Sequence, residues 1–397
     1  MSFTLRSFRN PIFYKTSTLL SRFECRNVIK VQSKTFKKKA LNEKPSSKWK
    51  IFGIASIVGI GFGAVYSYKN MKTHRLALLN SNVGKTSLIL KEIPDFTVSR
   101  KVVYPNDASG LELILFQYPT CPFCCKVRAF LDFHGLSYNV IEVNPVLRQQ
   151  LKWTDYKKVP ILLIKVADGY LQLNDSSMII SALTSYFHDQ EISLQEVAKF
   201  YPSISFYDDN GAVKNEILNR YFLMYQGVFP KDSTKESISE ERKWRKWADD
   251  VLVHTLSPNV YRNKDEALQA FQWFSEVGHW KELFPAWEHF IVVYVGAFAM
   301  WVISKRLKKK YNLKDDVRQS LYDECSVWLR ELNRKGTEFH GGSKPNLADL
   351  AVYGVLSSIE GCIAFSDLLQ NTKLKHWYFN MKHLINNQAG SASVAIC

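Results

Sequence analysis

The sequence predicts an α/β domain followed by an all-α domain, with a basic segment and one membrane-spanning helix in front of them. Three observations support this fold class. Strand and helix patterns alternate between residues 111 and 187, helical patterns dominate after residue 243, and residues 51–68 form an 18-residue run without charge. At about 1.5 Å per residue, such a run forms a helix just long enough to cross a bilayer.

The basic segment comes first. Residues 1–50 hold thirteen Lys and Arg residues against two acids, Glu24 and Glu43. This composition is typical of a mitochondrial targeting segment or a disordered basic tail, and its removal from the mature protein stays an alternative to a permanent anchor. The segment carries +11 of the net charge of +16, which leaves +5 for the other 347 residues. The charge therefore does not indicate a nucleic-acid partner.

After a connector at residues 69–103, we expect the α/β domain at residues 104–190. The hydrophobic patterns predict its elements in order: a strand at 111–118, a helix at 122–134, a strand at 137–143, a short helical crossover at 144–151, a hairpin of strands at 161–166 and 170–173, and a helix at 175–187. Strand–helix–strand followed by a hairpin and a helix is the order of the thioredoxin fold. That fold keeps a cis-proline facing its active thiol, and Val159-Pro160 lies at the matching place.

The run Tyr118-Pro119-Thr120-Cys121-Pro122-Phe123-Cys124 lies where the first strand pattern gives way to the helix. Pro122 suits the first helical position, because its missing N–H has no partner there anyway. Cys121 then lies at the helix tip, where unpaired N–H groups and the helix dipole stabilise a thiolate. Cys124, one turn later, is the expected resolving partner. Cys125 is either an alternative disulfide partner or an inert buried thiol. This pattern predicts thiol chemistry.

The other cysteines do not indicate disulfides or a metal. Seven cysteines, spread over 397 residues, do not form the dense framework of a secreted protein. Cys325 and Cys362 are expected to be buried small side chains. No second Cys or His pair stands at ligand spacing, so we expect no metal.

The second half of the chain predicts helices. Residues 191–242 are expected to be a linker and loop-rich insertion, and residues 243–388 an all-helical domain. Phe290–Ser304 carries no charge and is followed by a basic run, Lys305–Lys310. Fifteen residues are short for a second membrane span, so we interpret this segment as a buried helix. Asn346 and Asp349 match a capping box before the apolar run 350–359.

A glutaredoxin-like unit followed by a helical domain resembles the glutathione transferase layout. Within that superfamily the chain is similar to the microsomal prostaglandin E synthase type 2 family over about residues 104–385. The segments that carry the resemblance are Cys121–Cys124, Lys126–Gly135, Val140–Pro145, Lys158–Ile161, Leu173–Ala182, Ile303–Leu307 and Lys344–Leu356. Pro119 departs from the family, in which mammalian members carry lysine, and the loss of that charge raises the expected pKa of Cys121 and leaves Lys126 and Arg128 as its nearest cations.

The resemblance implies an enzyme that isomerises prostaglandin H2 to prostaglandin E2. Cys121 and Tyr118 match its catalytic residues, and Phe123 its pocket. The resemblance also implies glutathione beside the thiol, at the positions of Val159, Pro160, Asp175 and Ser176, and some members hold haem. It further implies a homodimer and a single-pass Golgi membrane protein with a processed, soluble cytoplasmic form, whereas the basic leader indicates mitochondria.

Two other functions stay open at this point. The same thiol pair suits a glutathione-dependent thiol-disulfide oxidoreductase or a glutathione transferase, which would need Cys124 for dithiol chemistry. A non-catalytic, membrane-anchored protein that binds haem or glutathione is the third hypothesis. The intact Cys121, Cys124 and Val159-Pro160 argue against a vestigial site.

Overall fold

The computed structural model describes residues 88–92, 96–207, 213–225 and 233–394. All of them belong to one structural unit, Asn70–Cys397. The predicted basic segment at 1–50 and the predicted span at 51–68 lie outside the described residues, so the fold below is that of the α/β and helical domains.

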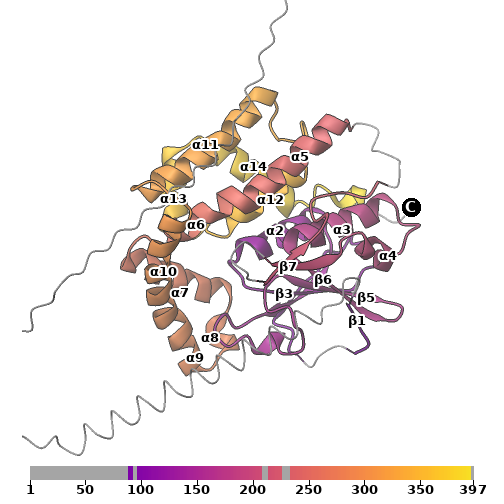
Figure 1. The fold of residues 1–397 in the computed structure, drawn as a ribbon, viewed down its shortest axis with the longest axis horizontal. Helices are drawn as coiled ribbons and strands as arrows, with labels where there is room; N and C mark the ends of the chain where they lie inside the picture. The colour runs from indigo at the N-terminus through magenta and orange to yellow at the C-terminus, as the bar shows by residue number, and fades with distance from the viewer. Residues whose placement is uncertain (1–87, 93–95, 208–212, 226–232, 395–397) are drawn as a thin grey trace, which may run out of the picture. The chain divides into compact units, whose positions relative to one another are not determined.

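The α/β domain is built on a six-stranded sheet with the order β1-β6-β5-β3-β4-β2. At its centre, β3 (Leu113–Gln117) runs parallel to β4 (Tyr138–Glu142) and antiparallel to β5 (Ile161–Val166), which forms a hairpin with β6 (Gly169–Asn174). The order of these elements along the chain is the one predicted from the thioredoxin fold. Helices α2 (Pro122–Phe133) and α3 (Ser176–His188) lie between the sheet and the helical domain (Figure 1).

Strand β3 is buried on both faces, which explains its uninterrupted apolar sequence. Leu113 and Leu115 join the core on the side of α2, together with Val127 and Phe130. Ile114 and Phe116 point to the opposite face, where they join a second cluster with Leu151, Val159 and Cys124 among others. The end of β3 is thereby held rigidly from both sides, and the thiol loop follows directly after it.

Several elements differ from the sequence predictions. The crossover at 144–151 contains only a 3-10 turn, η1 (Gln149–Leu151). At its start the backbone N–H groups of Val146 and Leu147 donate to Asn144 Oδ1, and Arg148 has a left-handed backbone, so no α-helix forms. The sheet gains two three-residue edge strands, β1 (Leu88–Leu90) and β2 (Arg100–Val102). The segment expected to be loop-rich contains the elements α4 (Leu194–Lys199), β7 (Ser203–Tyr207), β8 (Val213–Ile217) and the start of α5.

The remaining elements form the helical domain. They are α5 (Lys235–Trp247), η2 (Ala248–Leu252), α6 (Val253–Val260), α7 (Lys264–Val277), α8 (Trp280–Leu283), α9 (Ala286–Phe290), η3 (Ile291–Val295), α10 (Gly296–Lys310), α11 (Val317–Lys335), α12 (Leu347–Ser357), α13 (Ile363–Asn371), α14 (Lys375–Asn386) and η4 (Ser391–Ser393).

Helix α12 joins the two domains. Its capping box is formed as predicted: the Asn346 side chain accepts a hydrogen bond from the backbone N–H of Asp349, and the Asp349 side chain accepts one from the backbone N–H of Asn346. It packs against α2 so closely that a Cβ on Gly354 would lie 2.5 Å from the Cα of Lys126. A side chain at position 354 would push the helices apart, and α2 carries Cys121.

The prediction of a buried helix at 290–304 is wrong. This segment spans α9, η3 and α10, and Phe290, Tyr294 and Phe298 are 57%, 47% and 57% exposed. Only one side is covered, where α10 packs on α7. By length and composition, Ala286–Lys310 is the single helix among the described residues that meets the requirements of a membrane span, and 22% of its apolar window is buried. The absence of charged residues in this segment therefore did not indicate that its helix is buried.

Candidate active site at the start of α2

The chain leaves β3 and turns sharply before α2 begins, and this turn positions Cys121. The backbone N–H of Cys121 donates to the carbonyl of Tyr118 at 3.3 Å, and its own carbonyl accepts from the N–H of Cys125 at 2.9 Å. Cys121 is the N-cap residue of α2 and Pro122 the first helical residue, as predicted. Cys121 is half-buried, whereas Cys124 and Cys125 are buried.

The surroundings of Cys121 favour its thiolate. The Cys124 thiol donates a hydrogen bond to the sulfur, and this lowers the pKa of Cys121 more than burial raises it. The backbone N–H groups of Cys124 and Phe123 and the charge of Arg128 act in the same direction. Burial raises the pKa of Cys124 well above its ordinary value, and the negative charge on Cys121 raises it further. The pair therefore loses its first proton from Cys121, and the remaining proton stays on Cys124.

Arg128 supports the thiol loop from beneath. Its guanidinium donates to the carbonyl of Pro119 at 2.7 Å, to Gln117 Oε1 at 2.6 Å and to Cys125 Sγ at 3.1 Å. The Cys125 thiol in turn donates to the Pro119 carbonyl at 3.6 Å. Burial raises the pKa of Cys125. Cys125 thus acts as a neutral part of the loop's hydrogen-bond network.

Tyr118 contacts Cys121 from the side of the sheet. Burial raises the pKa of Tyr118, and the Arg148 guanidinium, which donates a hydrogen bond to the hydroxyl, opposes this rise. Arg148 has a left-handed backbone with φ at 51°, directly before η1. Its guanidinium also donates to the carbonyl of Lys157 at 3.3 Å. The sequence did not single out Arg148, because no residue pattern marks the irregular segment that carries it.

On the other side of Cys121, a cavity of about 280 Å³ separates the two domains. Its lining is largely apolar, and a few polar groups converge on it, as in most small-molecule sites. The lining residues from the thiol loop and α2 are Thr120, Cys121, Pro122 and Phe123, and those from the helical domain are Val253, His254, Leu256, Ser257, Val260, Tyr261, Phe274, Leu307, Tyr311, Ser358 and Ile359. Tyr118 is not part of this lining, so the structure places the two predicted catalytic residues side by side but only Cys121 in the cavity.

The residues predicted for glutathione lie on the sheet side of the thiol. The Val159–Pro160 peptide bond is cis, and Val159 packs in the same cluster as Cys124. Asp175 Oδ1 caps α3 by accepting from the N–H groups of Ser177 and Met178. This leaves Asp175 Oδ2, which forms an ion pair with Arg220 at 3.3 Å. The predicted capping role of Asp175 is confirmed, and the ion pair adds a cation to the site.

Tyr156 also belongs to this site, although the sequence did not indicate it. Its hydroxyl accepts from the backbone N–H of Asp175 and lies close enough to Cys121 and Cys124 for their charges to raise its pKa, in addition to the larger effect of burial. Ser176, at the first turn of α3, is buried. A helix N-terminus, one carboxylate and one guanidinium are the groups that bind the zwitterionic end of a peptide.

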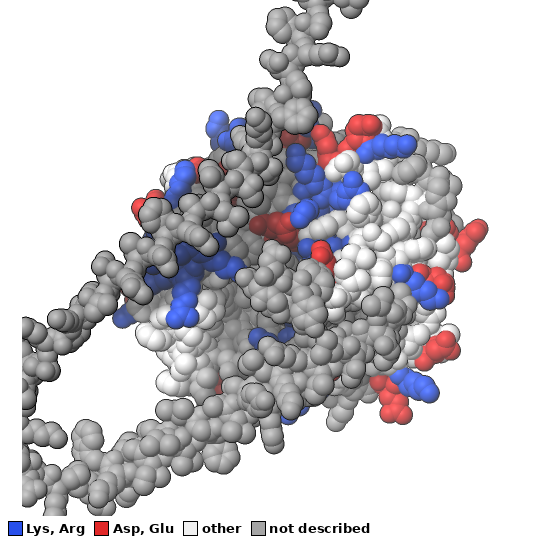
Figure 2. Space-filling model, viewed as in Figure 1, with Lys and Arg blue, Asp and Glu red and all other residues white. Residues whose placement is uncertain are grey.

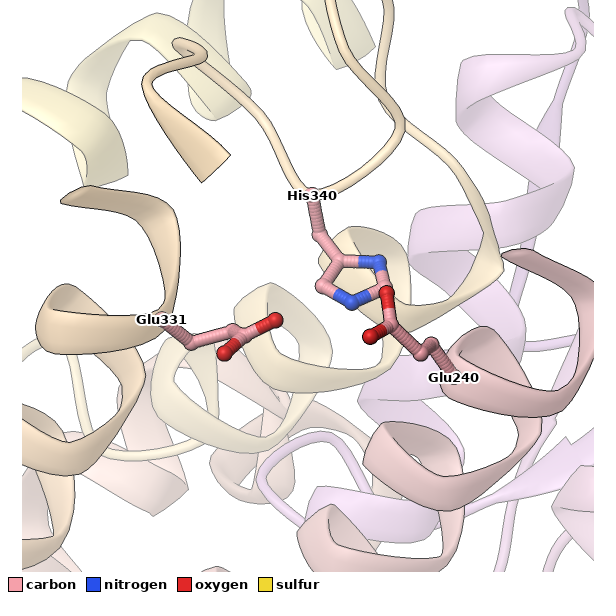
Figure 3. Close-up of side chains that lie close together, drawn as sticks. All are labelled: Glu240, Glu331 and His340. Carbon is pink, nitrogen blue, oxygen red and sulfur yellow. The ribbon is translucent and has the colours of Figure 1, made fainter. Parts of the chain in front are cut away.

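One cluster in the described residues has the composition of a metal site. Glu240, Glu331 and His340 come from α5, α11 and the loop before α12 and point toward one another (Figure 3). Asn346 Oδ1 is held by backbone N–H groups of α12, so its NH₂ group faces His340 Nδ1 at 3.0 Å. Nδ1 is thus an acceptor, and the neutral ring carries its proton on Nε2, where a metal would need a lone pair. We assign no metal to this cluster.

A larger hollow of about 880 Å³ lies elsewhere, along α11 and between α13 and α14. Its lining holds no cysteine. The chemistry of the thiol loop therefore selects the smaller cavity as the candidate active site. Cys325 and Cys362 are buried, as predicted, and neither lines the cavity at Cys121.

Several known proteins are similar to parts of this chain. A glutaredoxin family model matches residues 113–166. Among solved structures, glutathione S-transferase III in its apo form is 13% identical to this chain with a TM-score of 0.39. The match covers 72% of this chain and 98% of the glutathione S-transferase chain. The β-etherase LigF from Sphingobium sp. strain SYK-6 is 15% identical with a TM-score of 0.39, at 70% and 98% coverage.

Two curated relatives are much more similar. Prostaglandin E synthase 2 of Danio rerio is 43% identical over 339 residues, which cover 84% of this chain and 81% of the relative. Prostaglandin E synthase 2 of Mus musculus is 48% identical over 293 residues, which cover 73% and 75%. On this identity over most of both chains, the protein belongs to the prostaglandin E synthase 2 family.

Proposed function

We propose that this enzyme isomerises prostaglandin H2 to prostaglandin E2, with the Cys121 thiolate as its nucleophile. Membership of the prostaglandin E synthase 2 family supports the reaction. The observation that carries the assignment to Cys121 is its position: a thiol with a lowered pKa faces a largely apolar cavity between the domains. An apolar endoperoxide with a weak, electrophilic O–O bond matches both the lining and the soft nucleophile.

The chemistry balances without an external oxidant. The thiolate attacks one peroxide oxygen, so that an S–O bond forms, the O–O bond breaks, and the second oxygen leaves with the electron pair and takes up a proton. A base then removes the hydrogen from the carbon that carries the first oxygen. The C–H electrons form the C=O bond, the S–O bond breaks, and Cys121 returns as a thiolate.

The departing oxygen needs a proton donor, and two phenols qualify. Tyr118 and Cys121 pack against the same apolar cluster of the sheet. Burial is the main cause of the raised pKa of both Tyr118 and Tyr261, and the negative charge of Cys121 adds to it. Tyr118 is the residue that the resemblance implies, whereas Tyr261 lines the cavity. The variants Y118F and Y261F separate them: loss of kcat by about 100-fold identifies the donor, and an unchanged kcat excludes the residue from this role.

Glutathione supplies a second thiol beside Cys121 when it is bound, and the residues of the sheet side fit it. Arg220 would hold its γ-glutamyl carboxylate and Asp175 its ammonium group. Both side chains are accessible, at 29% and 25% exposure. Calorimetric titration with glutathione tests this assignment: R220M and D175N should weaken binding at least tenfold, and binding unchanged in both would refute it.

Haem is the second ligand that the family resemblance implies. Among the residues that line the cavity, His254 offers an imidazole and Cys121 a thiolate as iron ligands. Burial lowers the pKa of His254, which keeps its ring neutral and able to bind iron. A haem titration followed by absorption should show a ligand band that changes in H254Q or C121S, and an unchanged band would exclude both residues.

The alternative function is a glutathione-dependent thiol-disulfide oxidoreductase, which the hydrogen-bonded pair of Cys121 and Cys124 favours. The full-length enzyme, incubated with prostaglandin H2 with and without glutathione, separates the two. An isomerase should lose prostaglandin E2 formation in C121S and keep it in C124S. An enzyme that forms no prostaglandin E2 but reduces a mixed disulfide, and needs Cys124 to do so, would instead be the oxidoreductase.

The location and assembly that we propose follow the family. Residues 51–68 would anchor the enzyme in a Golgi membrane as a single span, with a processed soluble form, and two copies would form a homodimer. The basic leader supports a mitochondrial location as the alternative. The mass of the mature N-terminus, measured on protein from cells, distinguishes an intact anchor from a processed one.

A further inference from the structure

One surface of the helical domain is unusually apolar. We define the outer face of α9–α10 as the exposed large apolar residues of this segment. Their exposed fractions range from 37% to 58%, and four are aromatic. The residues are Trp287, Phe290, Ile291, Tyr294, Val295, Phe298, Val302 and Ile303. Contiguous apolar surface of this kind marks a contact with a protein or a membrane rather than with water.

The outer face is a feature of a folded helix and not of loose packing. The opposite side of the same helix is buried, at Val292, Val293 and Ala297. There Gly296 meets the ring of Phe271 on α7, and a Cβ at position 296 would lie 2.8 Å from it. The segment is thus held on the protein along one side, so it cannot cross a bilayer as a free span, but it can lie in the membrane interface.

The C-terminal end of this face is basic. The exposed stripe of the helix continues into Lys305, Arg306, Lys309 and Lys310 in its last two turns. Figure 2 shows basic side chains gathered beside an uncharged surface where Figure 1 places α7 and α10. The acid of this segment, Glu288, is buried and accepts hydrogen bonds from Asn144 at 2.6 Å and Gln149 at 3.3 Å. Its charge is therefore not presented on the surface.

The tryptophan near the basic end, Trp301, lies beside lysines, as tryptophans at a membrane interface do. Lys305 Nζ lies 4.0 Å and Lys264 Nζ 5.0 Å from the centre of the Trp301 ring. An amphipathic helix with Trp and Phe on one face and lysines beside it binds at the boundary of headgroups and acyl chains. Helix α10 carries no acidic side chain that would neutralise these lysines.

We propose that the outer face of α9–α10 docks the folded body of the enzyme onto a membrane that contains anionic lipids. The aromatic side chains enter the acyl boundary, and the lysines meet the negatively charged headgroups. The same helix also lines the cavity through Leu307, and Tyr311 follows directly after it. The docked surface and the cavity at Cys121 therefore share one helix, so that an apolar substrate would reach the cavity from the lipid.

The test uses the full chain on vesicles of phosphatidylcholine with phosphatidylserine, part of whose lipids carry bromine on the acyl chains. Bromine quenches tryptophan fluorescence only at close range, and Trp287 is 58% exposed at the start of the outer face. We expect quenching of the wild type to exceed that of W287F, because the fluorescence of Trp287 is lost on brominated lipid. No activity is measured, so this test does not depend on the proposed reaction.

A matched pair of variants supplies the control. F298D places a charge on the outer face, and F379D places one on α14, where Phe379 is 41% exposed. The account predicts that F298D abolishes quenching of Trp287 and that F379D leaves it unchanged. K305Q/K309Q should weaken quenching on anionic vesicles. Folding of each variant is checked by its thermal transition.

Two results would overturn the proposal. Trp287 could remain unquenched on the vesicles, or F298D and F379D could have equal effects. Light scattering on the protein in detergent then shows whether a second copy binds this face. A dimer that F298D converts to a monomer would assign the outer face to a second copy of the chain. An unchanged mass would leave the face without a lipid or protein partner.

Discussion

At the scale of single residues, the acidity of Cys121 depends first on its neighbour in the motif. The hydrogen bond from the Cys124 thiol is the largest of the effects that lower the pKa of Cys121. C124A removes the donor, whereas C124S replaces it with a hydroxyl. We expect the pKa of Cys121 to rise in C124A and to stay near the wild-type value in C124S, as measured by the pH dependence of alkylation. Equal shifts in both variants would contradict this account.

Arg148 gives a second prediction at this scale. It donates a hydrogen bond to the Tyr118 hydroxyl and limits the rise of its pKa. R148M should therefore make the phenol a weaker acid and lower kcat about tenfold if Tyr118 donates the proton, with KM unchanged. R148K should restore part of the loss.

The control for Arg148 is a double-mutant cycle with Y118F. If Arg148 acts through Tyr118, R148M has no further effect in the Y118F background. Additive losses would show that Arg148 acts on another group.

Several site residues were predictable from the sequence, because each belongs to a local pattern. Cys121 precedes a proline at a helix start, and Asp175 precedes an apolar helix, so both positions follow from capping rules. Tyr156, Arg148 and Arg220 were not predicted. They lie in segments without periodicity, and only the folded chain brings them to the thiol and to Asp175.

At the scale of elements, the contact between the two domains includes a buried ion pair. Lys126 of α2 is 1% exposed and donates to Asp249 of η2, which also accepts from Ser177 at 2.6 Å and Tyr221 at 3.0 Å. Burial opposes ionisation of Asp249, but the charge of Lys126 and the hydrogen bonds from Lys126, Ser177 and Tyr221 together outweigh it and hold the pKa of Asp249 below its ordinary value. The pair thus fixes α2, and with it Cys121, against the helical domain.

Breaking this pair should be costly because the lysine is left buried and uncompensated. D249L should lower the free energy of unfolding by about 3–5 kcal/mol, measured by urea denaturation. K126M/D249L, which removes both charges, should recover part of the loss. A double variant less stable than D249L would show that packing, and not the unpaired charge, causes the effect.

The elements that were predicted are those with a strong period. Strand β3, helix α2, strand β4 and the β5–β6 hairpin all lie within a few residues of their expected bounds. The edge strands β1 and β2 have three residues each and leave no pattern. Helix α5 starts at Lys235 with a charged, polar sequence, so its first turns resemble a loop until Trp244.

At the scale of the whole molecule, one partly buried and one fully buried histidine predict acid sensitivity. Burial lowers the pKa of His134 to about 4 and that of His340 to about 4. The unfolded chain has histidine pKa values of about 6.5. Between these values the unfolded state binds more protons than the folded state, so stability falls as the pH drops from 6.5 toward 4.

The measurement is the free energy of unfolding as a function of pH. Each histidine contributes a slope of up to about 1.4 kcal/mol per pH unit in this window. H340Q should flatten the slope by one such contribution, relative to H376Q, which replaces an exposed histidine on α14. An equal slope in the two variants would mean that His340 does not remain neutral in the fold.

The layout of two domains was predictable, because strand and helix periods separate along the chain. The exposure of the outer face of α9–α10 was not. Sequence alone shows that residues 290–304 are apolar. Whether such a helix is buried or exposed depends on how many other helices pack around it. Here α7 covers one side, and the other stays exposed.

The account's central claim is that the Cys121 thiolate performs the isomerisation. The most direct test compares two pH profiles of the full-length enzyme: the rate of alkylation of Cys121, and kcat/KM for prostaglandin E2 formation from prostaglandin H2. We predict that both rise with one common pKa, below the value of about 8.5 of an ordinary cysteine, and that C121S forms no prostaglandin E2. Prostaglandin E2 formation that persists in C121S, or that follows a pKa different from that of the Cys121 thiol, would contradict the claim.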